Sequence, residues 1–278
     1  MSFTTLVDVA TLAAHLGDRE WGVIDVRHQL SDVGYGERAY SESHIPGAVF
    51  LHCDRDLSGP VTGANGRHPW PERDRLVERL GEIGIGSQIQ VVVYDDAQGM
   101  IAGRLWALLR WLGHERVALL DGGLQAWRAA GGTMTSLPPK VRAVAFDASD
   151  EVGPITTDDV LERLETPGMR LVDARSPDRY RGENETIDPV GGHIPGAVNR
   201  FFRDNLLADG RYKPAAELRA EWLAVLAGAL PEQVIHQCGS GISACHNMLA
   251  MEIAGLPGSR LYAGSWSEWC VDPGRPIA

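Results

Sequence analysis

One six-residue motif occurs twice in this sequence and constrains its fold more than any other feature. HIPGAV stands at His44–Val49 and again, letter for letter, at His193–Val198. A D-x-R triplet precedes each copy, beginning at Asp25 before the first and at Asp173 before the second, at nearly the same interval. Repetition of this kind predicts an internal duplication of a unit of about 120 residues.

The two halves keep a constant offset in their later parts. Gly99 and Gly241 are separated by the same interval as Trp127 and Trp269. Short apolar runs alternate with helix-like segments, which favours an α/β fold with a mainly parallel sheet flanked by helices on both faces. We expect domains over 1–132 and 154–278, joined by a linker over 133–153 where GGTMTSLPPK and a polar stretch interrupt the periodicity.

Several helices and strands can be predicted from the spacing of apolar residues within each segment. We expect helices over 7–16, 76–83, 103–112 and 242–253, and strands over 23–26, 91–94 and 117–120. A loop is expected to lead to the first HIPGAV. The segment 53–71, rich in Asp, Gly, Pro and His, is expected to be an extended surface loop that could carry function.

Composition excludes several classes of function. The formal net charge of −11 and the pI near 5.3 disfavour nucleic acid and anionic membranes as partners. No basic leader and no apolar run of about 18 residues is present, so we expect a soluble, cytoplasmic protein. Four cysteines without a C-x-x-C pair are too few for a disulfide framework and are expected to be reduced thiols.

The stretch Val234–His246, VIHQCGSGISACH, has the form of a nucleophile loop. A strand ends at Cys238, small residues let the backbone curl around the sulfur, and a helix follows. Loop amides and a helix N-terminus both favour a thiolate. A buried structural cysteine is the alternative. The constant offset between the halves makes Asp96 the sequence equivalent of Cys238. This favours an active second repeat and an inert first repeat.

These motifs together resemble the two-domain rhodanese-type sulfurtransferases over nearly the whole chain. They are the paired D-x-R and HIPGAV segments, DGG at 121–123, GSWSEW at 264–269 and the loop CGSGIS at 238–243. The resemblance implies two tandem rhodanese-like domains in which Cys238 carries a persulfide between a donor and a nucleophilic acceptor. It implies no metal and no organic cofactor. Expected partners are a small sulfur donor and a thiol or cyanide acceptor, including thioredoxin-like proteins.

The CGSG loop is similar to that of the 3-mercaptopyruvate branch, whereas thiosulfate enzymes typically carry cationic residues after the cysteine. A neutral loop suits a monoanionic, carbon-bound donor better than the thiosulfate dianion. The resemblance implies catalytic roles for Cys238, Ser240, His68 and Asp54, and substrate binding by Arg179, Gly239, Gly241, Ile242 and Ser243. A histidine can protonate the enolate left by C–S cleavage. Arginine at 179 suits bidentate binding of a carboxylate.

The chain departs from that branch at one position. A second substrate arginine would fall at Asp188, and the interval to His193 is two residues shorter than expected. Arg181 is a candidate substitute. Thiosulfate therefore stays an alternative donor.

Two other functions are ranked lower. A cysteine phosphatase needs an arginine six positions after the cysteine, where Ala244 stands. A non-catalytic sulfur-binding module is disfavoured by the cysteine present in one half. His44 and His193 are assigned to structure because their motif also occurs in the inert half. Cys245, Trp266 and Trp269 are expected to pack in the core.

Overall fold

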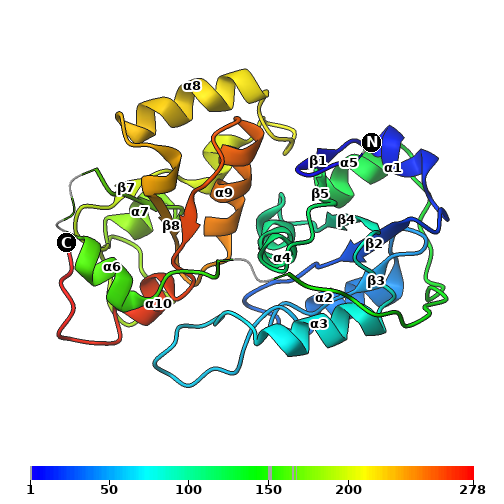
Figure 1. Cartoon of the computed structure of the whole chain (residues 1–278), viewed down its shortest axis with the longest axis horizontal. Coiled ribbons are helices and arrows are strands. Elements are labelled where there is room, and N and C mark those ends of the chain that lie inside the picture. The colour runs from blue at the N-terminus through cyan, green and yellow to red at the C-terminus, as the bar shows by residue number, and fades with distance from the viewer. Residues whose placement is uncertain (1, 150–151, 165, 167) are drawn as a thin grey trace. The chain divides into compact units, whose positions relative to one another are not determined.

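The computed structural model describes residues 2–149, 152–164, 166 and 168–278 (Figure 1). They form two compact units: the first contains residues up to 59, 71–152 and 208–211, and the second contains 60–70, 153–207 and 212–278. The continuous domain limits expected from the sequence remain a prediction. The expected linker, 133–153, includes Asp150 and Glu151, which lie outside the described residues. Within the described part, no helix combines the length and the apolarity needed to cross a bilayer.

The first unit is built on a five-stranded sheet in the order β1-β5-β4-β2-β3, and all its strand pairs among the described residues are parallel. Its strands are β1 (Leu6–Val7), β2 (Trp21–Asp25), β3 (Val49–Phe50), β4 (Gln90–Tyr94) and β5 (Val117–Leu120). Its helices are α1 (Val9–Ala14), α2 (Tyr35–Glu42), α3 (Arg73–Glu82), α4 (Met100–Trp111) and α5 (Gly123–Ala129). Parallel strands need crossover connections, and the alternating helices supply them.

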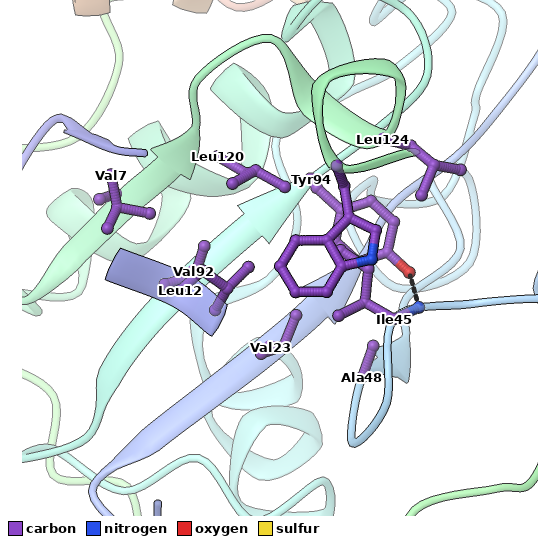
Figure 2. Close-up of a cluster of buried hydrophobic side chains, with 11 residues drawn as sticks. Val7, Leu12, Val23, Ile45, Ala48, Val92, Tyr94, Leu120 and Leu124 are labelled. Carbon is purple, nitrogen blue, oxygen red and sulfur yellow. Dashed lines mark hydrogen bonds between the residues drawn. The ribbon is translucent and has the colours of Figure 1, made fainter. Parts of the chain in front are cut away.

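Helices cover both faces of this sheet. On one face Leu12 of α1 and Leu124 of α5 pack with Val23 and Val92, as Figure 2 shows. Successive strand residues point to opposite faces, so Val93 points to the other face, and α4 contacts β4 and β5. Val92 and Val93 are both fully buried. The mainly parallel, doubly covered sheet predicted from the sequence is confirmed.

The second unit repeats this plan with a four-stranded parallel sheet in the order β7-β6-β8-β9. Its strands are β6 (Arg170–Asp173), β7 (Val198–Asn199), β8 (Val234–Gln237) and β9 (Arg260–Leu261). Its helices are α6 (Thr157–Arg163), α7 (Pro177–Tyr180), α8 (Ala215–Leu226), α9 (Ser243–Ile253) and α10 (Ser265–Trp269), with short 3₁₀ turns η1 (Phe202–Asn205) and η2 (Pro231–Gln233). Trp266 and Trp269 of α10 are fully buried in its core, as expected.

The repeated motifs serve the architecture of each unit. In the second unit Arg175 forms a buried ion pair with Asp173, with Nη2 2.6 Å from Oδ2, and the same Nη2 donates to the carbonyl of Gly192 at 2.8 Å. His193 stacks on Tyr180 and its Nδ1 lies 2.9 Å from the carbonyl of Tyr180. These contacts fasten the turn to the sheet, which agrees with a structural role for that histidine.

The D-x-R and HIPGAV motifs of the first unit make equivalent contacts. Arg27 pairs with Asp25 and donates to the carbonyl of Ser43 at 2.7 Å. His44 bonds the carbonyls of Tyr40 and Leu137. In Figure 2 the backbone N–H of Ile45 reaches the hydroxyl of Tyr94, at 3.2 Å.

Candidate active site around Cys238

Cys238 follows the last residue of β8 and is buried, with 2% of its surface exposed. The loop after it turns at Gly241, whose φ is +75°. A Cβ on Gly241 would lie 2.4 Å from the carbonyl oxygen of Ala263, so only glycine fits there. Helix α9 then begins at Ser243, with Ile242 as its N-cap. The predicted strand, glycine loop and helix are present in this order.

The N-terminus of α10 holds the cysteine from outside the loop. The backbone N–H of Cys238 donates to Oγ of Ser265 at 3.1 Å. In return, the N–H of Trp266 donates to the carbonyl of Cys238 at 3.0 Å, and the N–H of Ser267 donates to the carbonyl of Gly239 at 2.9 Å. These three bonds fix the backbone that carries the sulfur.

His68 and Ser240 form a pair beside the nucleophile loop. Nδ1 of His68 lies 2.7 Å from Oγ of Ser240, and each residue is 5% exposed. His68 belongs to the second unit because its segment, Pro60–Trp70, does. If the neutral imidazole carries its proton on Nε2, Nδ1 accepts a hydrogen bond from the serine hydroxyl. If the proton is on Nδ1, Nδ1 donates to the serine oxygen. The pair can therefore move a proton beside Cys238.

Two arginines lie beside Gly239. A Cβ on Gly239 would lie 2.9 Å from Nη2 of Arg67, and 3.6 Å and 3.7 Å from Nη1 and Nη2 of Arg179. Arg179 binds Glu185 through Nε and Nη2 at 2.8–3.0 Å, and its Nη2 lies 3.2 Å from Asp188. The loop itself is neutral, but guanidinium groups from two other segments supply positive charge next to it.

Arg67 is the residue that sequence reasoning missed. It stands in GRHPW directly before His68, where a single arginine in a long loop carries no periodic signal. Asp188, which occupies the position expected for a second arginine, forms an ion pair with Arg67. Arg179 is therefore not the only arginine beside Gly239.

The remaining sequence candidates differ in placement. Asp54 lies in the first unit, half-buried, and its N–H donates to Nδ1 of His52 at 3.1 Å, so its catalytic role stays a prediction. Arg181 has about half of its side chain exposed and is paired with Glu183, a contact that does not link it to Arg179 or Gly239. Nothing in these contacts supports it as a substitute substrate arginine.

The four cysteines are all free thiols. Burial raises the pKa of Cys53 to about 12 and also raises the pKa of Cys270, which keeps both protonated at neutral pH. Cys245 is fully buried on α9, where Sγ donates to the carbonyl of Gly241 at 3.2 Å. Packing is sufficient to explain Cys245.

The equivalent loop in the first unit is built around the carboxyl group of Asp95, whose pKa is raised by burial. The carboxylate of Asp95 accepts the backbone N–H groups of Ala97, Gly99, Ile101 and Ala102 at 2.8–2.9 Å. At the equivalent position of the second unit, directly before Cys238, stands the neutral Gln237. The two loops thus differ in the side chain at their start, a carboxyl group in the first unit and an amide in the second.

Comparisons with known proteins agree with this architecture. The family model described as "Rhodanese-like domain" matches residues 8–130 and 156–272. The chain is 46% identical over 281 residues to a protein of Pseudomonas aeruginosa named "Probable 3-mercaptopyruvate sulfurtransferase", covering 100% of this chain and 99% of that one. It is 36% identical over 255 residues to a bovine thiosulfate sulfurtransferase, covering 89% and 84%. The crystal structure of SseA from Escherichia coli, a 3-mercaptopyruvate sulfotransferase, matches with a TM-score of 0.82 and 30% identity, covering 96% of this chain and 100% of that one.

Proposed function

The chain belongs to the rhodanese-like family, and from that premise we propose that it is a sulfurtransferase that takes sulfur from 3-mercaptopyruvate. The sulfur passes to a thiol or to cyanide through a persulfide on Cys238. The duplicated fold and the thiol loop support the reaction class. Relatives named for both donors occur, so the choice of donor rests on the chemistry of the site.

In the first step the Cys238 thiolate attacks the sulfur of the donor. A new S–S bond forms as the C–S bond breaks, and the bonding electron pair stays on carbon as the enolate of pyruvate. Uptake of one proton by that carbon gives pyruvate. An acceptor thiolate or cyanide then attacks the outer sulfur, and the Cys238 thiolate leaves unchanged.

The observation that carries the donor assignment is the His68–Ser240 pair at 2.7 Å. Cleavage of a C–S bond needs a proton at carbon, and an imidazole can supply one near neutral pH. Sulfite, the leaving group from thiosulfate, needs no such proton. A proton-carrying pair beside the nucleophile therefore supports the carbon-bound donor.

Thiosulfate is the alternative donor, and one observation favours it: two guanidinium groups lie beside Gly239. Their charge is balanced, because Glu185 and Asp188 pair with Arg179 and Arg67. A balanced cluster suits a monoanion better than a dianion.

The first repeat is proposed to be non-catalytic, since Asp96 stands in the place of the cysteine and Asp95 fills the loop. Four free thiols support a reducing compartment, and we place the reaction in the cytoplasm. The acceptors proposed are small thiols, cyanide and thioredoxin-like proteins. Asp54 is proposed to assist His68 and Ser240, the role that the resemblance to the 3-mercaptopyruvate branch implies.

The test of the nucleophile is Cys238→Ser. We expect it to abolish transfer from either donor and to remove the single added sulfur that mass spectrometry should find on the wild-type chain after incubation with 3-mercaptopyruvate. Cys53→Ala is the matched control, because a thiol with a pKa of about 12 is not a nucleophile at neutral pH. Full turnover by Cys238→Ser would reject the proposal.

The test of the donor is His68→Gln. Loss of the proton donor should lower kcat with 3-mercaptopyruvate by roughly 10²- to 10⁴-fold. The rate with thiosulfate should fall much less. Equal losses with both donors, or a wild-type kcat/KM that strongly favours thiosulfate, would assign the site to the alternative.

A further inference from the structure

Three side chains of the first unit that can bind a metal ion lie at the carboxyl ends of two neighbouring strands. His28 follows β2 by three residues, and Cys53 and Asp54 follow β3. β2 and β3 pair in parallel (Figure 1), and beyond β3 the N–H of Leu51 donates to the carbonyl of Asp25 at 3.0 Å. One nitrogen, one sulfur and one oxygen of the three side chains lie within 4.8 Å of one another. We call His28, Cys53 and Asp54 the ligand cluster.

The backbone that carries Cys53 and Asp54 is held by its neighbours. The N–H of Asp54 donates to Nδ1 of His52 at 3.1 Å, and Nε2 of His52 lies 3.0 Å from the carbonyl of Val33. These contacts require the tautomer of His52 that carries its proton on Nε2. Oγ of Ser58 donates to the carbonyl of Cys53 at 2.9 Å. Both ring nitrogens of His52 are engaged, so His52 positions the ligand cluster and does not belong to it.

The second unit repeats the fold without repeating the ligand cluster. Counted from the D-x-R and HIPGAV motifs, the equivalent positions carry Ser176, Phe202 and Arg203. Phenylalanine and arginine do not bind metal cations. A requirement of the shared fold would appear in both repeats, so the fold alone does not account for the three side chains in the first.

The three ligand types together fit a divalent cation of the zinc type. Thiolate and imidazole bind zinc well, whereas magnesium and calcium take oxygen ligands. In a tetrahedral zinc site, ligands at about 2.0–2.3 Å from the metal lie about 3.5 Å from one another. Atoms that already lie within 4.8 Å reach this spacing through shifts of about 1 Å. Three protein ligands leave the fourth position to a water molecule.

Without a metal ion the Cys53 thiol keeps its proton. Burial raises its pKa to about 12; the charge of Arg104 acts against this rise and that of Asp54 adds to it. His28 is the other ionisable group of the ligand cluster. The thiolate is the form that binds metal, so a bound cation replaces the thiol proton. Binding therefore converts one thiol to a thiolate and releases one proton to solvent.

We propose that the ligand cluster binds a divalent cation of the zinc type, and that the bound ion withdraws the Asp54 carboxylate from sulfur transfer. The binding site stands on the geometry of the first unit alone. Its effect on turnover rests on the proposed function, in which Asp54 assists His68 and Ser240. Sulfur transfer by the metal-free chain does not use Cys53, so the site inhibits the reaction and takes no part in it.

Cobalt(II) is the probe for the site, because a thiolate ligand gives it a charge-transfer band in the near ultraviolet. The titration uses Cys238→Ser, so that the nucleophile cannot bind the ion. We expect one band that saturates at about one equivalent. Adding Cys53→Ala should abolish the band, and adding Cys270→Ala, which removes another buried thiol, should leave it unchanged. A band that is absent, or that survives Cys53→Ala, would overturn the site.

Zinc affinity and proton release give a second readout in the same Cys238→Ser chain. Cys53→Ala and His28→Gln should each weaken zinc binding by at least roughly 100-fold, because even the partners of metal ligands are worth roughly 10- to 100-fold. At about pH 8, where histidine is neutral, each bound ion should release about one proton, and Cys53→Ala should abolish this release. A competing chelator dye measures the affinity, and a pH indicator in weak buffer measures the protons. Equal affinity in all variants would contradict the proposal.

The effect on sulfur transfer is measured on the chain with Cys238 intact. Zinc loaded at about one equivalent, with unbound ion removed, should lower kcat with 3-mercaptopyruvate by at least roughly tenfold, a part of what general acid–base catalysis contributes. A chelator should restore kcat, and kcat of Cys53→Ala should be the same with and without zinc. If the cobalt band forms and zinc leaves kcat unchanged, the withdrawal of Asp54 is wrong. If the metal-free chain forms no persulfide from 3-mercaptopyruvate, the proposed function fails whatever the ligand cluster binds.

Discussion

Ser265 occupies a backbone conformation that serine rarely adopts. Its φ is +54°, and the equivalent residue of the first unit, Gly123, has a φ of +59°. A side chain in this region costs on the order of 1 kcal/mol that glycine avoids. The serine hydroxyl accepts the N–H of Cys238 and donates to the carbonyl of Tyr262 at 2.9 Å. The strained residue is therefore the one whose hydroxyl binds the backbone N–H of Cys238.

Two substitutions separate the strain from the hydroxyl. Ser265→Ala keeps the strain and leaves the Cys238 N–H unsatisfied, so it should lower the free energy of unfolding by about 1–3 kcal/mol. Ser265→Gly relieves the strain and should lower it less. Both should slow persulfide formation on the order of tenfold, because the sulfur loses its fixed position. Thermal melting and single-turnover mass spectrometry measure the two effects; wild-type rates in both variants would contradict this role.

At the scale of elements, β8 carries a buried histidine between two helices. His236 meets the ring edge of Trp222 on α8 at 5.5 Å between centroids, and its Nε2 lies 3.3 Å from Sδ of Met251 on α9. It is fully buried, and this burial lowers its pKa to about 3. The folded chain therefore keeps the imidazole neutral where the unfolded chain would protonate it.

This makes stability depend on pH in a defined direction. Between the ordinary histidine pKa of 6.5 and the folded value of about 3, the unfolded state binds one more proton. The free energy of unfolding should then fall as pH falls, by about 1 kcal/mol per pH unit from roughly pH 6 to pH 4. His236→Leu should lose this part of the slope. Urea unfolding of both proteins at several pH values gives the difference, and identical slopes would contradict it.

Elements with a local signal are predictable from sequence. The strand over 117–120 and the helix ending at Ile253 agree with β5 and α9, because apolar periodicity encodes them. The sequence pattern places Val7 in a helix, whereas it belongs to β1, since a two-residue strand depends on pairing with β5. The pattern also places α2 in a loop, because YGERAYSE carries few apolar positions.

The same distinction applies to the site. Cys238 and Ser240 are predictable because they lie together in one loop. The region 53–71 has the composition of a surface loop, yet Cys53, Leu57 and His68 are buried. The Arg67–Asp188 pair escapes prediction, because a contact between segments so far apart in the chain leaves no pattern in either of them.

At the scale of the whole molecule, the two repeats differ in the residue that begins each loop. In the first, the side chain of Asp95 accepts hydrogen bonds from four loop amides, while burial raises the pKa of its carboxyl group. In the second, Gln237 is neutral and fully buried, and neither of its side-chain polar atoms has a hydrogen-bond partner among the described residues. A carboxylate at 237 would compete with the thiolate for the same amides.

Gln237→Asp should therefore make the loop that carries Cys238 resemble the equivalent loop of the first unit. Occupied amides and a like charge beside the sulfur should slow persulfide formation by at least roughly 100-fold, about 3 kcal/mol. Gln237→Asn, which changes length and not charge, is the control and should lose much less. Mass spectrometry of Cys238 after one turnover measures both. Comparable rates in the two variants would show that charge at 237 is unimportant.

Pro60–Trp70 belongs to the second unit although its neighbours on both sides in the chain belong to the first. This limits how such a protein can diverge by recombination. A genetic event that copies only the later half carries the thiol and leaves behind the imidazole and one guanidinium group, His68 and Arg67. The two halves are therefore expected to stay together in one gene, because the first half of the sequence encodes a segment of the second unit.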